Sequence, residues 1–361
     1  MSTPALELDR INRILIIKLS SIGDVVHTFP MLTALRRRFS KASIAWLVQS
    51  ASAELVSGHQ ALDATYVLGN YRTNILPEAG TQWFQSGRQL ARRLRAEQFD
   101  LSLDVQGLFR SSIYGWLSRA RWRVGFRNRQ ELAFLFNNLS VIPDRRDCHA
   151  LEGYLEFARF FDAPIEPLAF DLPIRHEDRE WATEFLRSHE LAESAPLIAL
   201  MPGTRWDTKR WPADRFATVA AMLSQQYGVP FVITGGPADQ TLAQAIQALA
   251  EGTQIVDATG QTSLRQLAAL LERCRLAITN DSGPMHIAAA LGVPVVAIFG
   301  PTSPLRVGPY GAGHRVIQAS LSCVGCYRRK CSSLECLRRV TPAEVAQAAG
   351  DLIGQAVPCR P

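Results

Sequence analysis

The chain has 361 residues, of which 47% are hydrophobic and 20% are charged, so it can form the cores of about two domains and is not of the disordered class. Apolar stretches are short: the longest, residues 288–299, is interrupted by Gly292 and Pro294, which excludes a membrane-spanning helix. The apolar run near the N-terminus is too short for a signal peptide. We therefore expect a soluble protein of the cytoplasm.

The charge is unevenly distributed along the chain. Residues 1–150 hold 20 Lys and Arg against 12 Asp and Glu, whereas residues 151–361 hold 19 against 21. A basic half is typical of a protein that meets an anionic partner, such as nucleic acid, a membrane surface or an acidic small molecule. Because only four of the 39 basic residues are lysine, an arginine-rich solvated surface explains the excess equally well.

Alternating strand and helix patterns occur in two stretches of the chain. Short apolar runs rich in β-branched residues predict buried parallel strands, and longer periodic segments between them predict helices. In the first stretch the expected strands are Arg13–Leu19, Ser43–Val48, Ala64–Leu68 and Leu101–Val105. One helix follows the first strand and ends at Phe39, and two more are expected at Ala51–Ser57 and Phe84–Glu97. A charged, proline-containing segment around a helix at His176–Ser188 then links the two stretches.

The second stretch is more regular. Its expected strands are Leu197–Met201, Pro230–Thr234, Gln254–Asp257, Leu276–Asn280 and Val295–Phe299, and its expected helices are Ala213–Tyr227, Ala238–Ala250, Leu264–Glu272, Gly283–Leu291 and Pro342–Ile353. This pattern predicts an α/β protein with two doubly wound domains that face each other across a cleft, with ligands beyond the carboxyl ends of the strands. We place the domains at residues 1–170 and 171–340, followed by a C-terminal helix and tail at 341–361.

The first strand ends in a loop that contains a candidate catalytic carboxylate. Gly23 permits a tight turn into the following helix, and Ser20 and Ser21 place hydroxyls beside free helix N–H groups. Asp24 is a candidate general base for a substrate hydroxyl, although an aspartate at this place can equally well cap the helix. Farther along, Gln106 and Arg110 follow another strand, and Arg127 lies in a basic stretch at 119–129 that suits an anionic partner or an ordinary charged surface.

Three loops of the second stretch have features of phosphate or sugar sites. Thr204 and Lys209 precede a helix in a loop suited to phosphate, or to helix capping with an exposed lysine. Asp239 follows a strand as a ribose-binding carboxylate does, but no G-x-G-x-x-G precedes it, which disfavours a dinucleotide oxidoreductase.

The third of these loops runs into an apolar helix. Asp281 stands at the end of a strand, where it can orient a sugar hydroxyl, and Ser282 and Gly283 start the helix, where N–H groups favour a diphosphate. His286 falls one turn into this helix, a position typical of a structural hydrogen bonder as well as of a site residue.

A cysteine cluster occurs near the end of the chain. Four of the seven cysteines, Cys323, Cys326, Cys331 and Cys336, lie within 14 residues and have basic neighbours that favour thiolates. Such a set suits a structural zinc ion or an iron–sulfur centre, consists of free or partly oxidised thiols, or has a redox function, and we place no catalysis there.

Five motifs together resemble glycosyltransferase family 9, the bacterial heptosyltransferases of lipopolysaccharide synthesis. They are Lys18-x-Ser-Ser-Ile-Gly-Asp-Val-Val-His-Thr-x-Pro30, Asp104-x-Gln-Gly107, Pro202-Gly-x5-Lys-Arg-Trp-Pro212, Asn280-Asp-Ser-Gly-x-Met-His286 and Gly300-Pro-Thr-Ser-Pro304. The resemblance implies a GT-B fold and inverting, metal-independent transfer from an ADP-heptose donor to an anionic, lipid-anchored saccharide, Kdo or heptose. The absence of a D-x-D string agrees with a reaction that needs no metal cofactor.

The resemblance also implies roles for single residues. Asp24 matches the position of the base, and Lys209 matches the lysine at the donor phosphate and sugar. Donor contacts are implied for Thr204, Asp239, Asp281, Ser282, Gly283 and His286, and acceptor contacts for Ser20, Ser21, Gly23, Gln106, Arg110 and Arg127. With a lipid-anchored acceptor, peripheral contact with the cytoplasmic face of the inner membrane is expected.

Three other classes of protein compete with this interpretation. The basic half and the cysteine cluster would suit a nucleic-acid binder, but aromatic residues do not interleave the basic ones, so we expect no nucleic-acid partner. A GT-B enzyme with another donor sugar, or an epimerase or hydrolase, would share the donor motifs. A sugar-nucleotide binding protein without catalysis would share them too.

Overall fold

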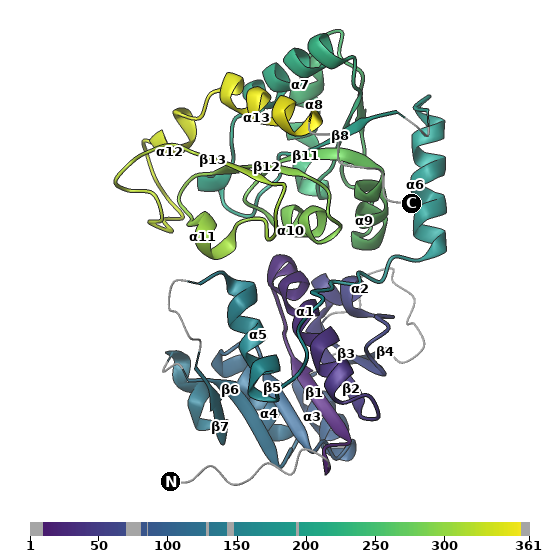
Figure 1. The fold of residues 1–361 in the computed structure, drawn as a ribbon, viewed down its shortest axis with the longest axis vertical. Helices are drawn as coiled ribbons and strands as arrows, with labels where there is room; N and C mark the ends of the chain where they lie inside the picture. Colours follow the sequence, from purple (N-terminus) through teal and green to yellow (C-terminus); the bar gives the residue numbers. More distant parts are fainter. Residues whose placement is uncertain are drawn as a thin grey trace. The chain divides into compact units, whose positions relative to one another are not determined.

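A computed structural model of the chain describes residues 10–69, 81–84, 86–127, 130–142, 148–192 and 195–354. The chain divides into two compact units, Met1–Pro173 and Ile174–Pro361. Each unit is built on one parallel sheet with helices on its faces (Figure 1). The closing helix, which the sequence analysis sets apart from the second domain, packs within the second unit.

The first unit has a seven-stranded sheet in the order β4-β3-β2-β1-β5-β6-β7. Its strands are β1 (Arg13–Ile17), β2 (Ser43–Gln49), β3 (Ala64–Leu68), β4 (Thr81–Phe84), β5 (Leu101–Asp104), β6 (Trp122–Phe126) and β7 (Leu139–Val141). The order reverses direction at β1 and β5, so the loops after these two strands diverge there, and a ligand crevice is typical of that point.

Helices cover both faces of this sheet. They are α1 (Ile22–Arg38), α2 (Ala53–Val56), α3 (Gly87–Ala96), α4 (Phe109–Leu117) and α5 (Ala150–Phe160), with 3-10 turns at Ser50–Ser52 and Gln130–Leu135. Helix α1 packs against α5. Leucines of α3 and Tyr114 of α4 join the apolar cluster that contains Leu15 and Ile17 of β1. The β1 run is therefore buried on both faces, which explains its unbroken apolar sequence.

The second unit has a six-stranded sheet in the order β10-β9-β8-β11-β12-β13. Its strands are β8 (Leu197–Met201), β9 (Phe231–Ile233), β10 (Ile255–Asp257), β11 (Cys274–Asn280), β12 (Val295–Phe299) and β13 (Arg315–Gln318). Its helices are α6 (His176–Ser188), α7 (Ala213–Tyr227), α8 (Gln240–Leu249), α9 (Leu264–Glu272), α10 (Gly283–Ala290), α11 (Pro304–Val307), α12 (Glu335–Arg338) and α13 (Pro342–Gly354).

One apolar cluster joins α7, α8 and α13 to the central strands β8, β9, β11 and β12. Helix α9 packs against α10 and against α6. An ion pair of 2.7 Å between Arg179 Nε of α6 and Glu272 Oε2 of α9 helps to hold α6 there. The helix of the linking segment therefore belongs to the second unit.

The sequence did not predict the strands at or near the sheet edges, namely β4, β6, β7 and β13, or the helices α4, α5, α11 and α12. The helix expected from Phe84 begins at Gly87, because Phe84 is the last residue of β4. In β6 the charge of Arg123 interrupts the apolar pattern, yet its guanidinium donates to the carbonyls of Phe136 and Ala120, both at 2.8 Å. Among the described helices, none has the length and apolar character needed to cross a bilayer.

Candidate functional site

Asp24 lies in the first turn of α1 and forms a capping box with Ser21, the last residue of the loop after β1. The N–H and the hydroxyl of Ser21 donate to Asp24 Oδ2 at 3.1 and 2.8 Å. Ser21 is the N-cap residue and Gly23 is buried in the first turn of α1. The capping role that the sequence left open for Asp24 is thus present in the structure, and it occupies only one of the two carboxylate oxygens.

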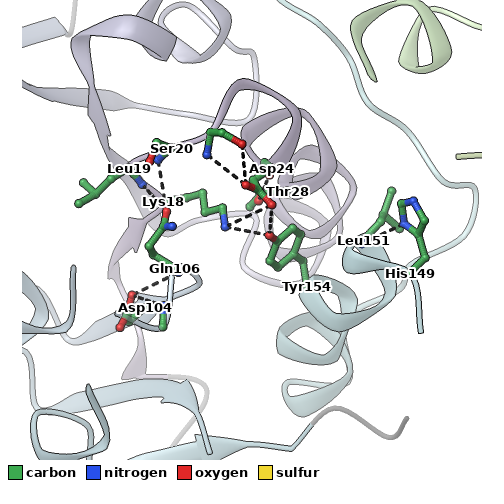
Figure 2. A network of polar contacts seen from close by, with 12 residues as sticks. Lys18, Leu19, Ser20, Asp24, Thr28, Asp104, Gln106, His149, Leu151 and Tyr154 are labelled. Carbon is green, nitrogen blue, oxygen red and sulfur yellow. Dashed lines mark hydrogen bonds and ion pairs between the residues drawn. The ribbon is translucent and has the colours of Figure 1, made fainter. Parts of the chain in front are cut away.

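The second oxygen of Asp24 belongs to a buried network that the sequence analysis missed (Figure 2). The hydroxyl of Tyr154, on α5, donates to Asp24 Oδ1 at 2.6 Å. Lys18 Nζ donates to the Tyr154 oxygen at 2.8 Å and lies 4.0 Å from Asp24 Oδ1. The Lys18 side chain is 3% exposed, whereas that of Asp24 is 35% exposed, so the carboxylate is the solvent-facing member of the network.

The electrostatics of this network favour an ionised Asp24. Burial raises the pKa of Asp24, but the charge of Lys18 and the hydrogen bonds from Tyr154 and Ser21 outweigh it and bring the pKa well below its ordinary value. Burial, the charge of Asp24 and the hydrogen bond raise the pKa of Tyr154, which stays a neutral donor. Burial lowers the pKa of Lys18, and the charges of Asp24 and Asp104 oppose that change.

The turn after β5 braces the same loop. Gln106 Oε1 accepts from the N–H groups of Leu19 and Ser20, both at 3.2 Å, and an Arg110 nitrogen lies 3.4 Å from Ser20 Oγ. Ser20, Gln106 and Arg110 therefore lie together beside Asp24, and their acceptor contacts stay a prediction. Arg127 is exposed just after β6, at the same edge of the parallel sheet; residues 128–129 of its basic stretch lie outside the described residues.

Asp104 shapes this turn from inside the unit. Its Oδ1 accepts from the N–H groups of Gln106 and Gly107 at 3.2 and 3.1 Å, and its Oδ2 accepts from the Ser112 hydroxyl. Burial raises the pKa of Asp104, and these hydrogen bonds oppose that rise. Gly107 has a φ of 72°, a left-handed conformation that suits glycine.

A second site lies at the carboxyl edge of the sheet in the second unit. Asn280, the fully buried last residue of β11, donates to the Pro202 carbonyl at 2.8 Å and accepts from the Trp211 N–H at 3.2 Å. These bonds fix both ends of the loop that follows β8. The loop thereby presents Lys209 beside the end of β11.

Lys209 and Asp281 form an ion pair in this site, with 2.7 Å between Nζ and Oδ2. Thr302, in the turn after β12, donates to the same oxygen at 2.6 Å. Gln318 Nε2 in turn donates to the carbonyls of Thr302 and Gly300 at 3.0 and 3.2 Å. Asp281 is thus buried and fixed, while Lys209 remains partly exposed and available to an anion.

Helix α10 begins directly after Asp281. Ser282 is its N-cap residue, with an extended backbone and no capping bond from its own side chain, and Gly283 is the first helical residue. First-turn N–H groups of a helix lack partners within the helix and favour negative charge. His286 is buried one turn farther along α10, so it can pack behind the residues that start the helix.

The side chains of Thr204 and Asp239, at the same edge of the sheet, bond to backbone groups of their own loops. The Thr204 hydroxyl donates to the Trp206 carbonyl at 2.7 Å, and Asp239 Oδ2 accepts from the Gly236 N–H at 2.9 Å. The Asp239 carboxylate lies so close to Gly203 and Gly235 that neither position has room for a Cβ. Asp239 also lines a pocket of about 320 Å³, together with Arg210, Ala238, Thr241, Leu242 and Ala245.

The four thiols of the cysteine cluster do not converge on a metal-binding arrangement in the part of the chain that the structure describes. Cys323, Cys326 and Cys331 are exposed, and Cys336 is buried in α12. Within the described ranges, no group of three or more His, Cys, Asp or Glu side chains is arranged to hold a metal ion. Burial, and the neighbouring Cys323 and Cys331, raise the pKa of Cys336, which favours its neutral thiol. The described structure therefore gives no support for the structural metal ion that was one interpretation of the sequence.

Each unit thus combines a doubly wound parallel sheet with a polar site at the carboxyl edge, as in glycosyltransferases of the GT-B class. The model of "Glycosyltransferase family 9 (heptosyltransferase)" matches residues 87–337, so the chain belongs to this family and is a glycosyltransferase. The family, the enzyme class and the GT-B fold expected from the sequence are confirmed.

Three relatives illustrate the similarity. The lipopolysaccharide heptosyltransferase 1 of Pseudomonas aeruginosa is 28% identical over 89% of this chain and 87% of its own length. A solved family 9 glycosyltransferase from Veillonella parvula has a TM-score of 0.81 and 28% identity, covering 97% of this chain and 99% of its own. The Escherichia coli heptosyltransferase WaaC, solved with ADP, has a TM-score of 0.72 and 24% identity, covering 94% and 99%.

Proposed function

We propose that this chain transfers a heptose from ADP-heptose to an anionic inner-core lipopolysaccharide acceptor, Kdo or heptose, with inversion and without a metal ion. The names of the heptosyltransferase relatives support the sugar and the pathway, and the ADP in the E. coli structure supports the nucleotide. The single observation that carries the proposal is the Lys209–Asp281 pair at the start of α10, since it places a cation and a buried carboxylate beside a helix N-terminus at one edge of the sheet.

On the donor side, Lys209 and the first turn of α10 would bind the diphosphate. A lysine ammonium and the N–H dipoles of a helix start can together neutralise a leaving diphosphate as a metal does in other enzymes. Asp281, held by Thr302, would orient the sugar hydroxyls. We assign the rest of the donor contacts to Thr204, Asp239, Ser282, Gly283 and His286.

On the acceptor side, Asp24 would be the general base. A base must be deprotonated before it acts, and the Lys18–Tyr154 network keeps Asp24 ionised while its carboxylate stays partly exposed. We assign acceptor binding to the residues that surround it at the same sheet edge, namely Ser20, Ser21, Gly23, Gln106, Arg110 and Arg127.

The reaction is a direct displacement. The acceptor oxygen bonds to the anomeric carbon, the bond from that carbon to the diphosphate oxygen breaks, and the acceptor proton passes to Asp24. ADP leaves with the electron pair, which Lys209 and the α10 N–H groups stabilise. Attack from the face opposite the leaving group inverts the anomeric centre, and no metal or other cofactor enters the balance.

The cellular setting follows from the acceptor. We propose that the protein works in the cytoplasm, on the inner face of the inner membrane, because its acceptor would be lipid-anchored. The excess of basic residues in 1–150 would favour peripheral contact with anionic lipid and saccharide. No nucleic-acid partner is proposed.

The first test is the Asp24→Asn variant, assayed with ADP-heptose and heptose-deficient lipopolysaccharide. Loss of a general base lowers a rate by about 10²–10⁴-fold, so we expect that loss in kcat with ADP binding nearly unchanged. Asp162→Asn is a matched control, because Asp162 is an exposed aspartate of the same unit whose positive φ asparagine tolerates.

Two results would contradict the proposal. Normal transfer by Asp24→Asn would remove Asp24 as the base. A wild-type protein that is stabilised by UDP- or GDP-sugars and not by ADP-sugars would overturn the donor. Product analysis with and without acceptor separates glycosyl transfer from an epimerase or hydrolase reaction.

A further inference from the structure

The cysteine-rich segment at 319–340 lies against the loops of the second site. The Tyr327 N–H donates to the Pro301 carbonyl at 2.8 Å, in the turn that also contains Thr302. The buried hydroxyl of Thr208 donates to the Arg328 carbonyl at 2.9 Å. These two bonds fix the backbone of 327–328 between the turn after β12 and the loop that holds Lys209, and Arg329 follows at once.

Arg329 shares an aromatic ring with Lys209. The Arg329 guanidinium carbon lies 4.8 Å from the centroid of the Trp206 ring, and Lys209 Nζ lies 4.6 Å from the same centroid. Both distances are within the range of cation–π attraction. The Trp206 ring therefore contacts two cations, one from the loop after β8 and one from the cysteine-rich segment.

The charges around this ring are not balanced. Asp281 pairs with Lys209, and Arg210 of the same loop pairs with Asp207 at 3.0 Å. Arg329 forms no ion pair with any residue that the structure describes, and its side chain is exposed. Lys209 is paired with Asp281, so Arg329 adds a positive charge at this ring that no described carboxylate neutralises, and an anion there is favoured.

We propose that Arg329 is a donor-binding residue, which with Lys209 and Trp206 forms a two-cation site for the diphosphate of the nucleotide sugar. This inference rests on the proposed glycosyl transfer and adds a phosphate contact from the cysteine-rich segment. A guanidinium can donate two parallel N–H bonds to phosphate oxygens, which the Lys209 ammonium cannot do with the same geometry. The segment thereby completes the donor site that the loop motifs begin.

The test compares ADP and adenosine binding by calorimetry in the full-length wild type, Arg329→Ala and Arg329→Lys. We expect Arg329→Ala to weaken ADP binding roughly ten-fold, the loss typical of one charge-assisted hydrogen bond, and to leave adenosine binding unchanged. Arg329→Lys should recover part of the loss, because it keeps the charge but not the planar fork. The loss should shrink at high salt, because the site is open to solvent.

Lys330→Ala is the matched control, because it removes one exposed positive charge from the next residue of the same segment. It should bind ADP as the wild type does, and thermal unfolding of all three variants checks that they fold. Equal ADP affinity in wild type and Arg329→Ala, or an equal loss in Arg329→Ala and Lys330→Ala, would overturn the role of Arg329. A wild type that binds none of ADP, UDP or GDP would instead overturn the proposed function itself.

Discussion

At the scale of single residues, the pKa of Asp24 affects the proposed reaction in two opposite ways. A general base must be ionised, yet a carboxylate that is strongly stabilised takes up a proton weakly. Tyr154 is hydrogen bonded to both Asp24 and Lys18, so it fixes the position of the carboxylate and, beside the charge of Lys18, lowers its pKa. Tyr154 is therefore a positioning residue for the proposed reaction, acting through Asp24.

The Tyr154→Phe variant tests this role through the pH dependence of kcat/KM. The pKa of Asp24 is lowered in part by the Tyr154 hydrogen bond, so loss of the hydroxyl raises that pKa. Because Asp24 acts when ionised, we expect the acid limb of the profile to move to higher pH, with the largest loss of rate at low pH. Tyr114→Phe makes the same change on α4 of the same unit and should leave the profile in place; an unmoved limb in Tyr154→Phe would contradict the role.

At the scale of elements, the loops after the strands are held by close backbone approach. The Asp239 carboxylate occupies the space beside Gly203, where an added Cβ would lie 2.7 Å from Asp239 Cγ. The loop after β8 and the loop after β9 therefore contact each other only because Gly203 has no side chain. Asn280 fastens the same loop to β11.

We predict that Gly203→Ala displaces Asp239 and lowers both the free energy of unfolding, by about 1–3 kcal/mol, and the affinity for ADP. Gly153→Ala is the contrast: Gly153 lies inside α5 and an added Cβ meets nothing within 4 Å. Alanine there should raise the free energy of unfolding by about 0.5–1 kcal/mol. Urea denaturation measures both changes, and equal effects of the two variants would show that the space beside Gly203 is not limiting.

At the scale of the whole molecule, each unit has its own sheet and its own apolar core. A ligand stabilises the part of a protein that binds it, by about 2.7 kcal/mol at a concentration of 100 times Kd. All proposed ADP contacts lie in the second unit, so stabilisation by ADP should begin there.

Differential scanning calorimetry tests this expectation. We predict two overlapping unfolding transitions, of which saturating ADP raises the one that belongs to the second unit. The Gly153→Ala variant identifies the transition of the first unit, because Gly153 lies in α5 of that unit and alanine there should shift only that transition. A single transition that moves as one with ADP would show that the two units unfold together.

Local sequence patterns were enough to predict the central strands and the loops in which the polar site residues lie. Strands such as β8 and β12 are buried on both faces, so their apolar runs are continuous and easily recognised. The loops that follow β1, β8 and β11 could be named as sites, because carboxyl ends of parallel strands share one edge. Edge strands such as β13 bury less, and their sequences carry little signal.

Which side chains meet depends on the packing of distant parts of the chain and could not be predicted from local patterns. Tyr154 reaches Asp24 across 130 positions of the sequence because α5 packs on α1, and no local pattern contains that contact. Arg329 reaches the Trp206 ring from a segment in which the sequence drew attention only to the cysteines. Periodicity and spacing report on neighbours within one element, whereas hydrogen bonds and ring contacts between distant segments depend on how the whole chain packs.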